Sequence, residues 1–343
     1  MELFVYPRAP RPAPSLNRGR SALRAFRAAG PFFLAIALAA CAGTPVSAVP
    51  TIEPTPTPIA TVSPTPAPTA AFPVTITDDE GATVAVATEP RRIVSLTPAA
   101  TETLFAIGAG DRVVAKVEDI TPYPPEADGL PVVATYKGVD IEQIVNLQAD
   151  LVVAGGLGFT PPAAVTQLRN LGIPVIVLYA ESVAGALAGI ETIGRATGAF
   201  DAAQTLTKAM QGEVDRLAGL TAGLPRPRTF YEIDATSDIY TVPAGSLYEE
   251  MLRLAGSDPI TTDSSYQISL EKLIVANPEV ILLGDGGYTT PADVAARPNW
   301  AGIAAVANGQ VVPVDDTLIT RPGPRLVDGL RALIAALHPE VRL

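Results

Sequence analysis

Two stretches of this sequence share one pattern, and that pattern is a helix followed by a buried strand. Residues 140–155 (DIEQIVNLQADLVVAG) match residues 269–284 (SLEKLIVANPEVILLG) at every apolar step, and Glu142 falls on Glu271. The helical half and the strand half both match, which a chance similarity between two helices would not produce. The repeat therefore predicts two related α/β lobes within one chain.

A second pair of segments occurs in the same order along the chain. Residues 102–108 and 250–256 share the spacing E-x-L-x-x-x-G. Short β-branched runs alternate with helical patterns around both pairs, which indicates βαβ units and parallel sheets. Strands are expected at residues 92–96, 113–117, 151–154, 175–178, 228–233, 280–283 and 310–314, and helices at 101–107, 141–147, 162–171, 246–255, 270–276 and 324–337.

One long helix is expected between the two halves. Asp201 suits an N-cap position, and apolar residues follow it at helical spacing through Leu217. We expect an N-terminal lobe over residues 73–199, a linking helix over 200–222 and a C-terminal lobe over 223–343. Two such lobes leave a ligand cleft at the carboxyl ends of their strands.

The first 40 residues have the layout of a secretory signal. Six arginines and one Glu precede an apolar run over residues 31–40 (PFFLAIALAA), and Cys41 follows. Residues 38–41 (LAAC) resemble a bacterial lipobox, in which the cysteine becomes the lipidated first residue. We expect residues 1–40 to be a lipoprotein signal peptide and Cys41 to hold an extracytoplasmic protein on the membrane.

The segment after Cys41 is rich in Pro and Thr. Residues 41–72 carry almost no charge, so they cannot form a core and favour extended polyproline II. At about 3.1 Å per residue the segment reaches roughly 90 Å. It is expected to be a tether for the folded lobes, which begin near Pro73.

The residue counts limit the chemistry of the lobes. The chain has 343 residues, one Cys and one His, and a net charge of −11, which becomes −16 without residues 1–40. An acidic chain is a poor partner for nucleic acid. One His excludes multi-histidine metal sites. His338 itself suits a helix C-terminus, which leaves no other His for a Ser-His-Asp site. We therefore expect no enzymatic activity, no cofactor and no metal site.

Five segments together resemble the periplasmic-type binding proteins of ABC importers, above all their cobalamin and iron-siderophore class. They are residues 92–102 (RIVSLTPAATE), 123–127 (YPPEA), 138–142 (GVDIE), 149–153 (ADLVV) and 321–329 (RPGPRLVDG). The resemblance implies an α/β fold of two Rossmann-like lobes with parallel sheets, bridged by one long helix. It also implies a monomer whose partners are the ABC permease and ATPase subunits.

The resemblance implies roles for individual residues. Glu102 and Glu250 become the carboxylates, one on each lobe surface, that dock onto the permease. Tyr123, Tyr136 and Arg321 match positions that line the ligand cleft. The other aromatic candidates for ligand contact are Tyr240, Tyr266, Tyr288 and Trp300.

A corrinoid is the leading ligand, because ring faces suit a large planar macrocycle. A ferric siderophore is the second, with Arg297, Arg321 and Arg325 as candidate contacts. Haem bound through a tyrosine stays open as well. A hypothesis of another class is a surface enzyme or adhesion module on a duplicated α/β scaffold, because fold alone does not define function.

Overall fold

The computed structural model describes residues 72–156, 158–284 and 287–343. The predicted signal peptide, Cys41 and the tether up to residue 71 lie outside the described residues. None of the helices in the described part of the chain combines the length and the apolarity needed to cross a bilayer.

The N-terminal lobe is built on a six-stranded sheet with the order β6-β5-β4-β3-β7-β8. All neighbouring strands are parallel except β5 and β6. The chain runs from β3 outward to β4 and β5 and then returns to the other side of β3, so a topological switch point lies between β3 and β7. The strands are β3 Ile93–Ser95, β4 Val113–Val117, β5 Val132–Thr135, β6 Gly138–Val139, β7 Leu151–Gly155 and β8 Val175–Leu178.

Helices and a hairpin cover this sheet. The hairpin, β1 Val74–Thr77 with β2 Thr83–Val86, is antiparallel. The helices are α1 Pro98–Ala106, α2 Ile141–Asn146, α3 Pro162–Asn170 and α4 Val183–Thr197, with 3-10 turns at Gly110–Arg112 and Pro125–Ala127. Side chains of Thr97, Asp140 and Ser182 cap α1, α2 and α4 by accepting backbone N–H bonds.

The C-terminal lobe repeats this plan with antiparallel additions. Its sheet has the order β12-β10-β9-β13-β14, and β11 pairs with β9 as well. Strands β9, β11, β13 and β14 are parallel, while β10 and β12 run antiparallel to their neighbours. The strands are β9 Arg228–Asp234, β10 Ile239–Thr241, β11 Asp258–Pro259, β12 Gln267–Ile268, β13 Val280–Leu283 and β14 Val311–Pro313. The helices are α6 Leu247–Leu254, α7 Leu270–Ala276, α8 Pro291–Ala295, α9 Ala304–Ala307, α10 Asp316–Ile319 and α11 Leu326–Leu337.

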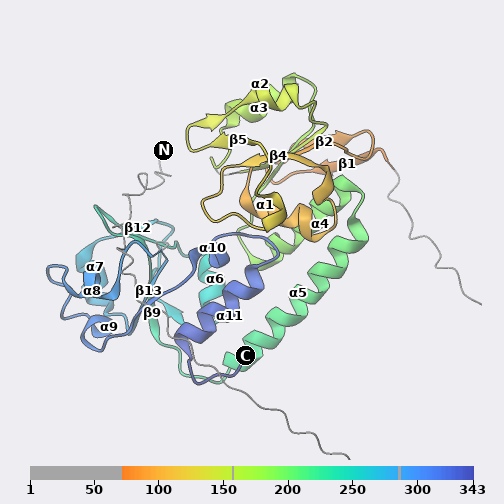
Figure 1. The fold of residues 1–343 in the computed structure, drawn as a ribbon. Helices are drawn as coiled ribbons and strands as arrows, with labels where there is room; N and C mark the ends of the chain where they lie inside the picture. Colours follow the sequence, from red (N-terminus) through yellow and green to blue (C-terminus); the bar gives the residue numbers. More distant parts are fainter. Residues whose placement is uncertain (1–71, 157, 285–286) are drawn as a thin grey trace, which may run out of the picture. The chain divides into compact units, whose positions relative to one another are not determined.

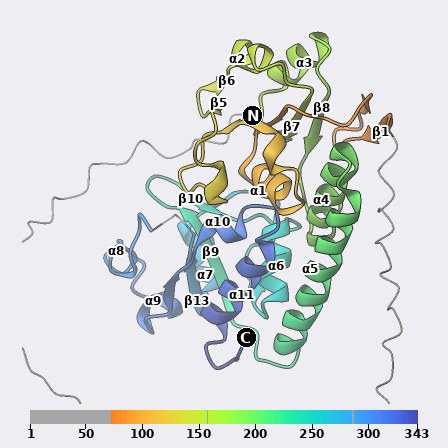
Figure 2. The same ribbon diagram turned by 45° about the vertical axis from the view of Figure 1, so that its right-hand side comes forward.

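One long helix, α5 Phe200–Thr221, joins the two lobes (Figures 1 and 2). Its buried residues recur every three or four positions, from Ala203 through Met210 to Leu217, and this face packs against α4 and α11. Its 22 residues give a length of about 33 Å. The predicted fold class, two α/β lobes bridged by one long helix, is confirmed.

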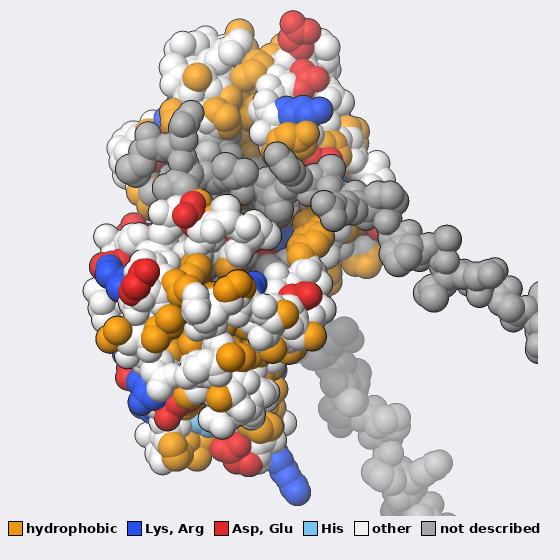
Figure 3. Space-filling model, turned by 90° about the vertical axis from the view of Figure 1, so that its left-hand side faces the viewer, with side chains coloured by type: hydrophobic (Ala, Val, Ile, Leu, Met, Phe, Trp, Pro, Cys, Tyr) orange, Lys and Arg blue, Asp and Glu red, His pale blue; other side chains and the backbone are white. Residues whose placement is uncertain are grey.

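The surface mixes side chains of different kinds. On the face shown in Figure 3, acidic and basic side chains are scattered among hydrophobic ones. No Lys- and Arg-rich patch of the kind that binds nucleic acid is visible on that face.

Candidate functional site

Exposed rings and aliphatic side chains collect in the loops that follow the parallel strands. Tyr136, 74% exposed, comes directly after β5, and Tyr123 lies in the loop after β4. In the C-terminal lobe Tyr288, 62% exposed, follows β13. Ile120 and Phe159, which the sequence analysis missed, are exposed in the loops after β4 and β7. Exposed apolar side chains at the carboxyl ends of parallel strands are placed where α/β sheets bind ligands.

A glycine closes each copy of the repeat at this edge of the sheets. A Cβ on Gly155 would lie 2.7 Å from the Thr97 methyl carbon, and one on Gly284 would lie 2.1 Å from the Tyr231 hydroxyl. Contacts this short exclude a side chain at either position. The two glycines therefore leave room for the Thr97 and Tyr231 side chains beside the carboxyl ends of β7 and β13.

Tyr240 and Tyr266 lie together at the antiparallel edge of the C-terminal lobe. Tyr240 pairs with Gln267 across β10 and β12, and the Thr241 amide donates to the Tyr266 carbonyl over 2.8 Å. Both residues are half-buried, and burial raises the pKa of the Tyr266 phenol. Their ligand roles stay predictions, with part of each residue still exposed.

Trp300 does not belong with the exposed aromatic residues. It is 3% exposed and packs in the core of the C-terminal lobe. The Arg297 guanidinium lies 4.6 Å from its ring centroid and also makes a bidentate ion pair with the buried carboxylate of Glu232 (2.6 and 2.7 Å). The expectation that Trp300 contacts ligand is wrong in this structure, because the ring is already covered by its own lobe.

Glu102 is not a surface carboxylate. Its side chain has 0% exposure and lies on α1, facing two arginines of the C-terminal lobe. Arg325 donates to both of its oxygens (2.9 and 2.7 Å), and Arg321 donates to one (3.1 Å). The expected docking role of Glu102 is therefore wrong for this structure, because a fully buried carboxylate cannot meet a partner protein.

Arg321 completes a network that joins the lobes. Its guanidinium makes two bonds to the Asp119 carboxylate (2.8 and 3.0 Å) and one to the Thr121 hydroxyl (2.9 Å). We call Glu102, Asp119, Arg321 and Arg325 the interlobe ion cluster. Arg321 was expected to contact ligand; that role stays a prediction for a side chain that is 11% exposed and has these partners.

Arg325 connects the interlobe ion cluster to a predicted ligand residue. Its guanidinium carbon lies 4.2 Å from the ring centroid of Tyr123. Hydrogen bonding to Glu102 raises the pKa of Arg325 above its ordinary value. The cluster therefore holds the Tyr123 ring against a permanently charged side chain of the other lobe.

Glu250 also makes a contact between elements of the two halves. It is half-buried on α6, and its carboxylate accepts the Val183 amide over 2.8 Å. Val183 is the first residue of α4, so the carboxylate lies at the positive end of that helix. The docking role of Glu250 stays a prediction, for a carboxylate that already caps a helix.

A different pair of acids has the exposure that docking requires. Glu142 and Glu271 lie in the first turns of α2 and α7, at matched positions of the repeat, and both are exposed. Bonds from its own amide and from the Ser269 hydroxyl hold the pKa of Glu271 below its usual range. The repeat in the sequence aligns these two residues, but only the structure shows that both are exposed and could therefore contact a partner.

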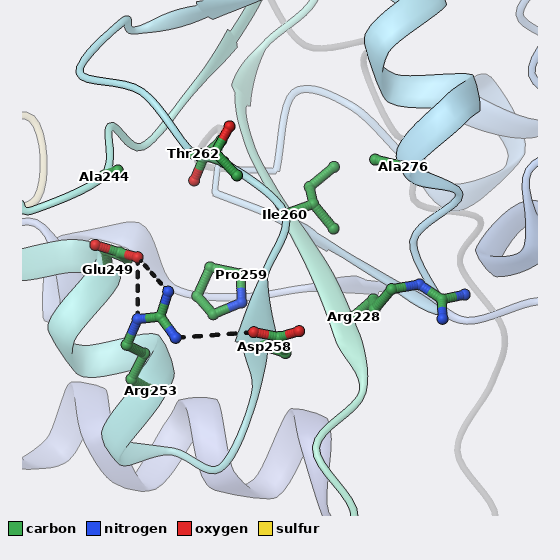
Figure 4. A pocket seen from close by; sticks show the side chains of 10 residues that line it. Arg228, Ala244, Glu249, Arg253, Asp258, Pro259, Ile260, Thr262 and Ala276 are labelled. Atoms are coloured by element: carbon green, nitrogen blue, oxygen red, sulfur yellow. Dashed lines mark hydrogen bonds and ion pairs between the residues drawn. The ribbon is translucent and has the colours of Figure 1, made fainter.

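Two pockets lie at the amino ends of strands in the C-terminal lobe. One, of about 450 Å³, is lined by Arg228, Glu249, Arg253 and Asp258 among others (Figure 4). The other, of about 530 Å³, is lined in part by His338, whose Nε2 lies 3.2 Å from the Gly256 carbonyl. None of the predicted ligand residues lines either pocket, and both lie away from the strand ends where parallel sheets bind ligands.

The part of the chain that the structure describes contains no group of three or more His, Cys, Asp or Glu side chains able to hold a metal ion. Several of its buried carboxylates are instead paired with arginines across short distances. The arrangement can hold a ligand by surface contact at the strand ends.

The sequence and the fold are both similar to known proteins. The family model described as periplasmic binding protein matches residues 93–318. A Bacillus subtilis relative, named an uncharacterized ABC transporter substrate-binding lipoprotein, is 33% identical over 78% of this chain and 87% of its own. A Halobacterium salinarum relative, named a cobalamin-binding protein, is 32% identical over 78% of this chain and 75% of its own.

Among solved structures, the apo form of a periplasmic heme-binding protein from Roseiflexus aligns with a TM-score of 0.66. Its sequence is 25% identical, and the alignment covers 73% of this chain and 98% of that one. The relatives with named ligands thus include both corrinoid and haem binders.

Proposed function

The chain belongs to the periplasmic binding protein family, and we propose that it is a lipid-anchored receptor that delivers a corrinoid to an ABC importer. It acts outside the cytoplasm as a monomer and catalyses no reaction on its cargo. The match over residues 93–318 and the names of the relatives support the importer class.

The exposed rings at the strand ends are the observation that supports a corrinoid as the ligand. Tyr123 and Tyr136 in one lobe and Tyr288 in the other leave ring surface open to solvent, together with Ile120 and Phe159. Apolar side chains are normally exposed singly, so five in the loops at one end of the sheets indicate a surface covered by ligand. A corrinoid offers a large macrocycle that such a surface can contact, with amide side chains for the polar loops.

Calorimetric titration of the purified chain with cyanocobalamin and cobinamide tests this proposal. We expect Tyr136→Ala and Tyr288→Ala each to weaken binding about tenfold, the effect of about 1.4 kcal/mol of lost ring contact. Leu171→Ala is the matched control, because Leu171 is exposed just after α3 and away from the strand ends. Failure of the wild-type chain to bind either corrinoid contradicts the proposal.

Haem is the second candidate ligand, and the exposed phenols of Tyr136 and Tyr288 favour it because tyrosine is a known axial ligand of haem iron. A tyrosinate–iron absorption band that appears with haemin and is lost in Tyr136→Phe or Tyr288→Phe would favour haem. The phenylalanine variants keep the ring contact, so corrinoid binding should survive them.

We propose that Glu142 and Glu271 dock the protein onto the importer's permease. Each acid is exposed at the start of a short helix, and an exposed aliphatic residue, Val145 or Ile274, lies three positions further on. Residues three apart lie on the same side of a helix, so each lobe presents one charge beside one apolar contact. One acid per lobe steers and orients association with a basic partner.

Transport in proteoliposomes that contain the permease and ATPase tests the docking pair. We expect Glu142→Arg with Glu271→Arg to abolish uptake and to leave ligand affinity unchanged. Glu80→Arg with Asp215→Arg is the control, because it makes the same charge change at two other exposed acids. Normal uptake by the first double variant would exclude this pair.

We also propose that Cys41 carries the lipid anchor, on the support of the lipobox-like LAAC sequence and the lipoprotein name of the Bacillus subtilis relative. Cys41→Ser should move the protein from the membrane fraction to the soluble fraction. A wild-type chain that incorporates no radiolabelled palmitate would contradict the anchor.

A further inference from the structure

Three arginines were candidates for binding an anionic ligand, and each one is paired with a buried carboxylate. Arg297 pairs with Glu232, Arg325 with Glu102, and Arg321 with Asp119 and Glu102. The side chains of these three carboxylates are 5% exposed or less. The positive charges of these three arginines are already balanced within the protein.

Asp119 is the carboxylate among these three that lies in a loop after a parallel strand of the N-terminal lobe. It lies two residues beyond β4, in the same loop as Ile120 and Tyr123. These two residues are part of the proposed ligand face, the exposed apolar side chains at the strand ends: Ile120, Tyr123, Tyr136, Phe159 and Tyr288. Its two oxygens receive both terminal nitrogens of Arg321. Asp119 is thus the counter-ion that lies in a loop of the proposed ligand face.

The interlobe ion cluster contains two carboxylates and two guanidinium groups, so its formal charge is zero. An anionic group of a ligand would have to compete with Asp119 for Arg321, at a site where Glu102 also binds that arginine. A neutral ligand faces no such competition, and it can contact Ile120 and the Tyr123 ring with the cluster intact. The same cluster would become positive by one charge if Asp119 were neutral.

We propose that Asp119 is a specificity-determining residue, which neutralises Arg321 and so selects uncharged cargo over anionic cargo. The inference rests on the proposed function, in which the strand-end loops hold the ligand. It assigns to this protein a neutral macrocycle as its cargo class.

Two ligands that differ by one charge test the proposal. Cyanocobalamin is neutral, and its derivative with one propionamide hydrolysed to a carboxylate has almost the same shape. We expect the wild-type chain to bind the neutral form more tightly, and Asp119→Asn to shift the affinity ratio about tenfold toward the acid, as expected for one partly screened charge. Raising the salt concentration should shrink this shift.

Matched variants separate charge from structure. Thr121→Val removes the hydroxyl contact to the same arginine without changing charge, so it should leave the ratio unchanged. Asp119→Asn with Arg321→Gln restores a neutral cluster and should restore the wild-type ratio. Haemin and its dimethyl ester differ by two carboxylate charges at similar shape, so they form a second test pair and should shift in the same direction.

The outcomes distinguish this inference from the proposed function. Binding of cyanocobalamin with an unchanged ratio in Asp119→Asn, or an equal shift in Thr121→Val, overturns the inference and leaves the proposed function standing. Tighter wild-type binding of the carboxylate form also overturns it. If no corrinoid binds but the haemin ester is preferred over haemin, the corrinoid proposal fails and the role of Asp119 is supported. If no probe binds, both fail.

Discussion

The segments 102–108 and 250–256 have the same spacing and nearly the same local structure, yet their glutamates make very different contacts. Both segments form a helix that ends at a glycine with positive φ, Gly108 at 80° and Gly256 at 84°. Glu102 on α1 is fully buried between two arginines. Glu250 on α6 is half-buried and accepts a single backbone bond.

The two contacts run crosswise between the halves of the molecule. Glu102 reaches Arg325, the residue just before α11, and Glu250 reaches Val183, the first residue of α4. Each glutamate thus meets the start of a helix that follows the sheet of the other half. The repeat places the two carboxylates at equivalent positions. They differ in their partners, since Glu102 pairs with arginine side chains and Glu250 accepts one backbone N–H.

The largest loss in the free energy of unfolding is expected when the buried glutamate, Glu102, is neutralised. Glu102→Gln leaves the guanidinium of Arg325 without its carboxylate, and removing one partner of a buried ion pair costs about 3–5 kcal/mol. Urea unfolding at neutral pH measures this loss, with Glu80→Gln, an exposed acid, as control. A loss below about 1 kcal/mol would mean that the two glutamates are energetically alike.

Substituting the glycines that follow the two helices, Gly108 and Gly256, should also cost different amounts of stability. Alanine at either position costs about 1–2 kcal/mol because an L-residue is strained in the left-handed region. A Cβ on Gly256 also lies 2.8 Å from the His338 ring and from Thr221, whereas a Cβ on Gly108 has no atom within 4 Å. Gly256→Ala should therefore destabilise the protein by roughly 1–3 kcal/mol more than Gly108→Ala. Thermal unfolding of both variants checks the order, and equal losses would refute it.

A smaller effect is expected at Glu250. Glu250→Ala removes a charged acceptor from the start of α4, which also keeps its Ser182 cap, so the loss should be about 1 kcal/mol. Glu250→Gln should retain most of the stability, because its amide oxygen can still accept the Val183 N–H. Equal losses for the alanine and glutamine variants in urea unfolding would argue against the hydrogen bond.

The smallest effect on stability is expected at a partly exposed contact between α5 and α11. Hydrogen bonds from Arg216 and then Arg331 lower the pKa of Glu213 to about 2 from an ordinary value of 4.5. Its folded-state pKa is depressed, so its contribution to stability is full above pH 4.5 and is lost as the pH falls toward 2. The unfolding midpoint of Glu213→Gln should approach that of wild type between these pH values, while a constant gap would contradict the shift.

The sequence predicted several elements of the fold from runs of apolar residues at strand or helix spacing, although it missed the helix α4. The strand over 113–117, the helix over 270–276 and the linking helix near 200–222 appear as β4, α7 and α5. Strands such as β10 and β12 have only two or three residues, too few to show a period, and the sequence analysis did not predict them. The hairpin β1–β2 was missed as well.

The functional residues were predicted less evenly. Tyr123, Tyr136 and Tyr288 lie exposed at strand ends, but Trp300 is buried against Arg297. Residue type and position after a strand are visible in the sequence, whereas the neighbour that covers a ring comes from a distant segment. Glu102 and Arg325 are 223 residues apart, and no local pattern signals that they pair.

By itself, the sequence determined the duplicated α/β plan and the long helix between the lobes, because hydrophobic periodicity and glycine positions act over short distances along the chain. Only the tertiary structure decided which charges are free. Burial and pairing depend on which surfaces the two lobes bring together, and this turned Glu102 from a surface acid into a counter-ion and left Glu142 and Glu271 exposed.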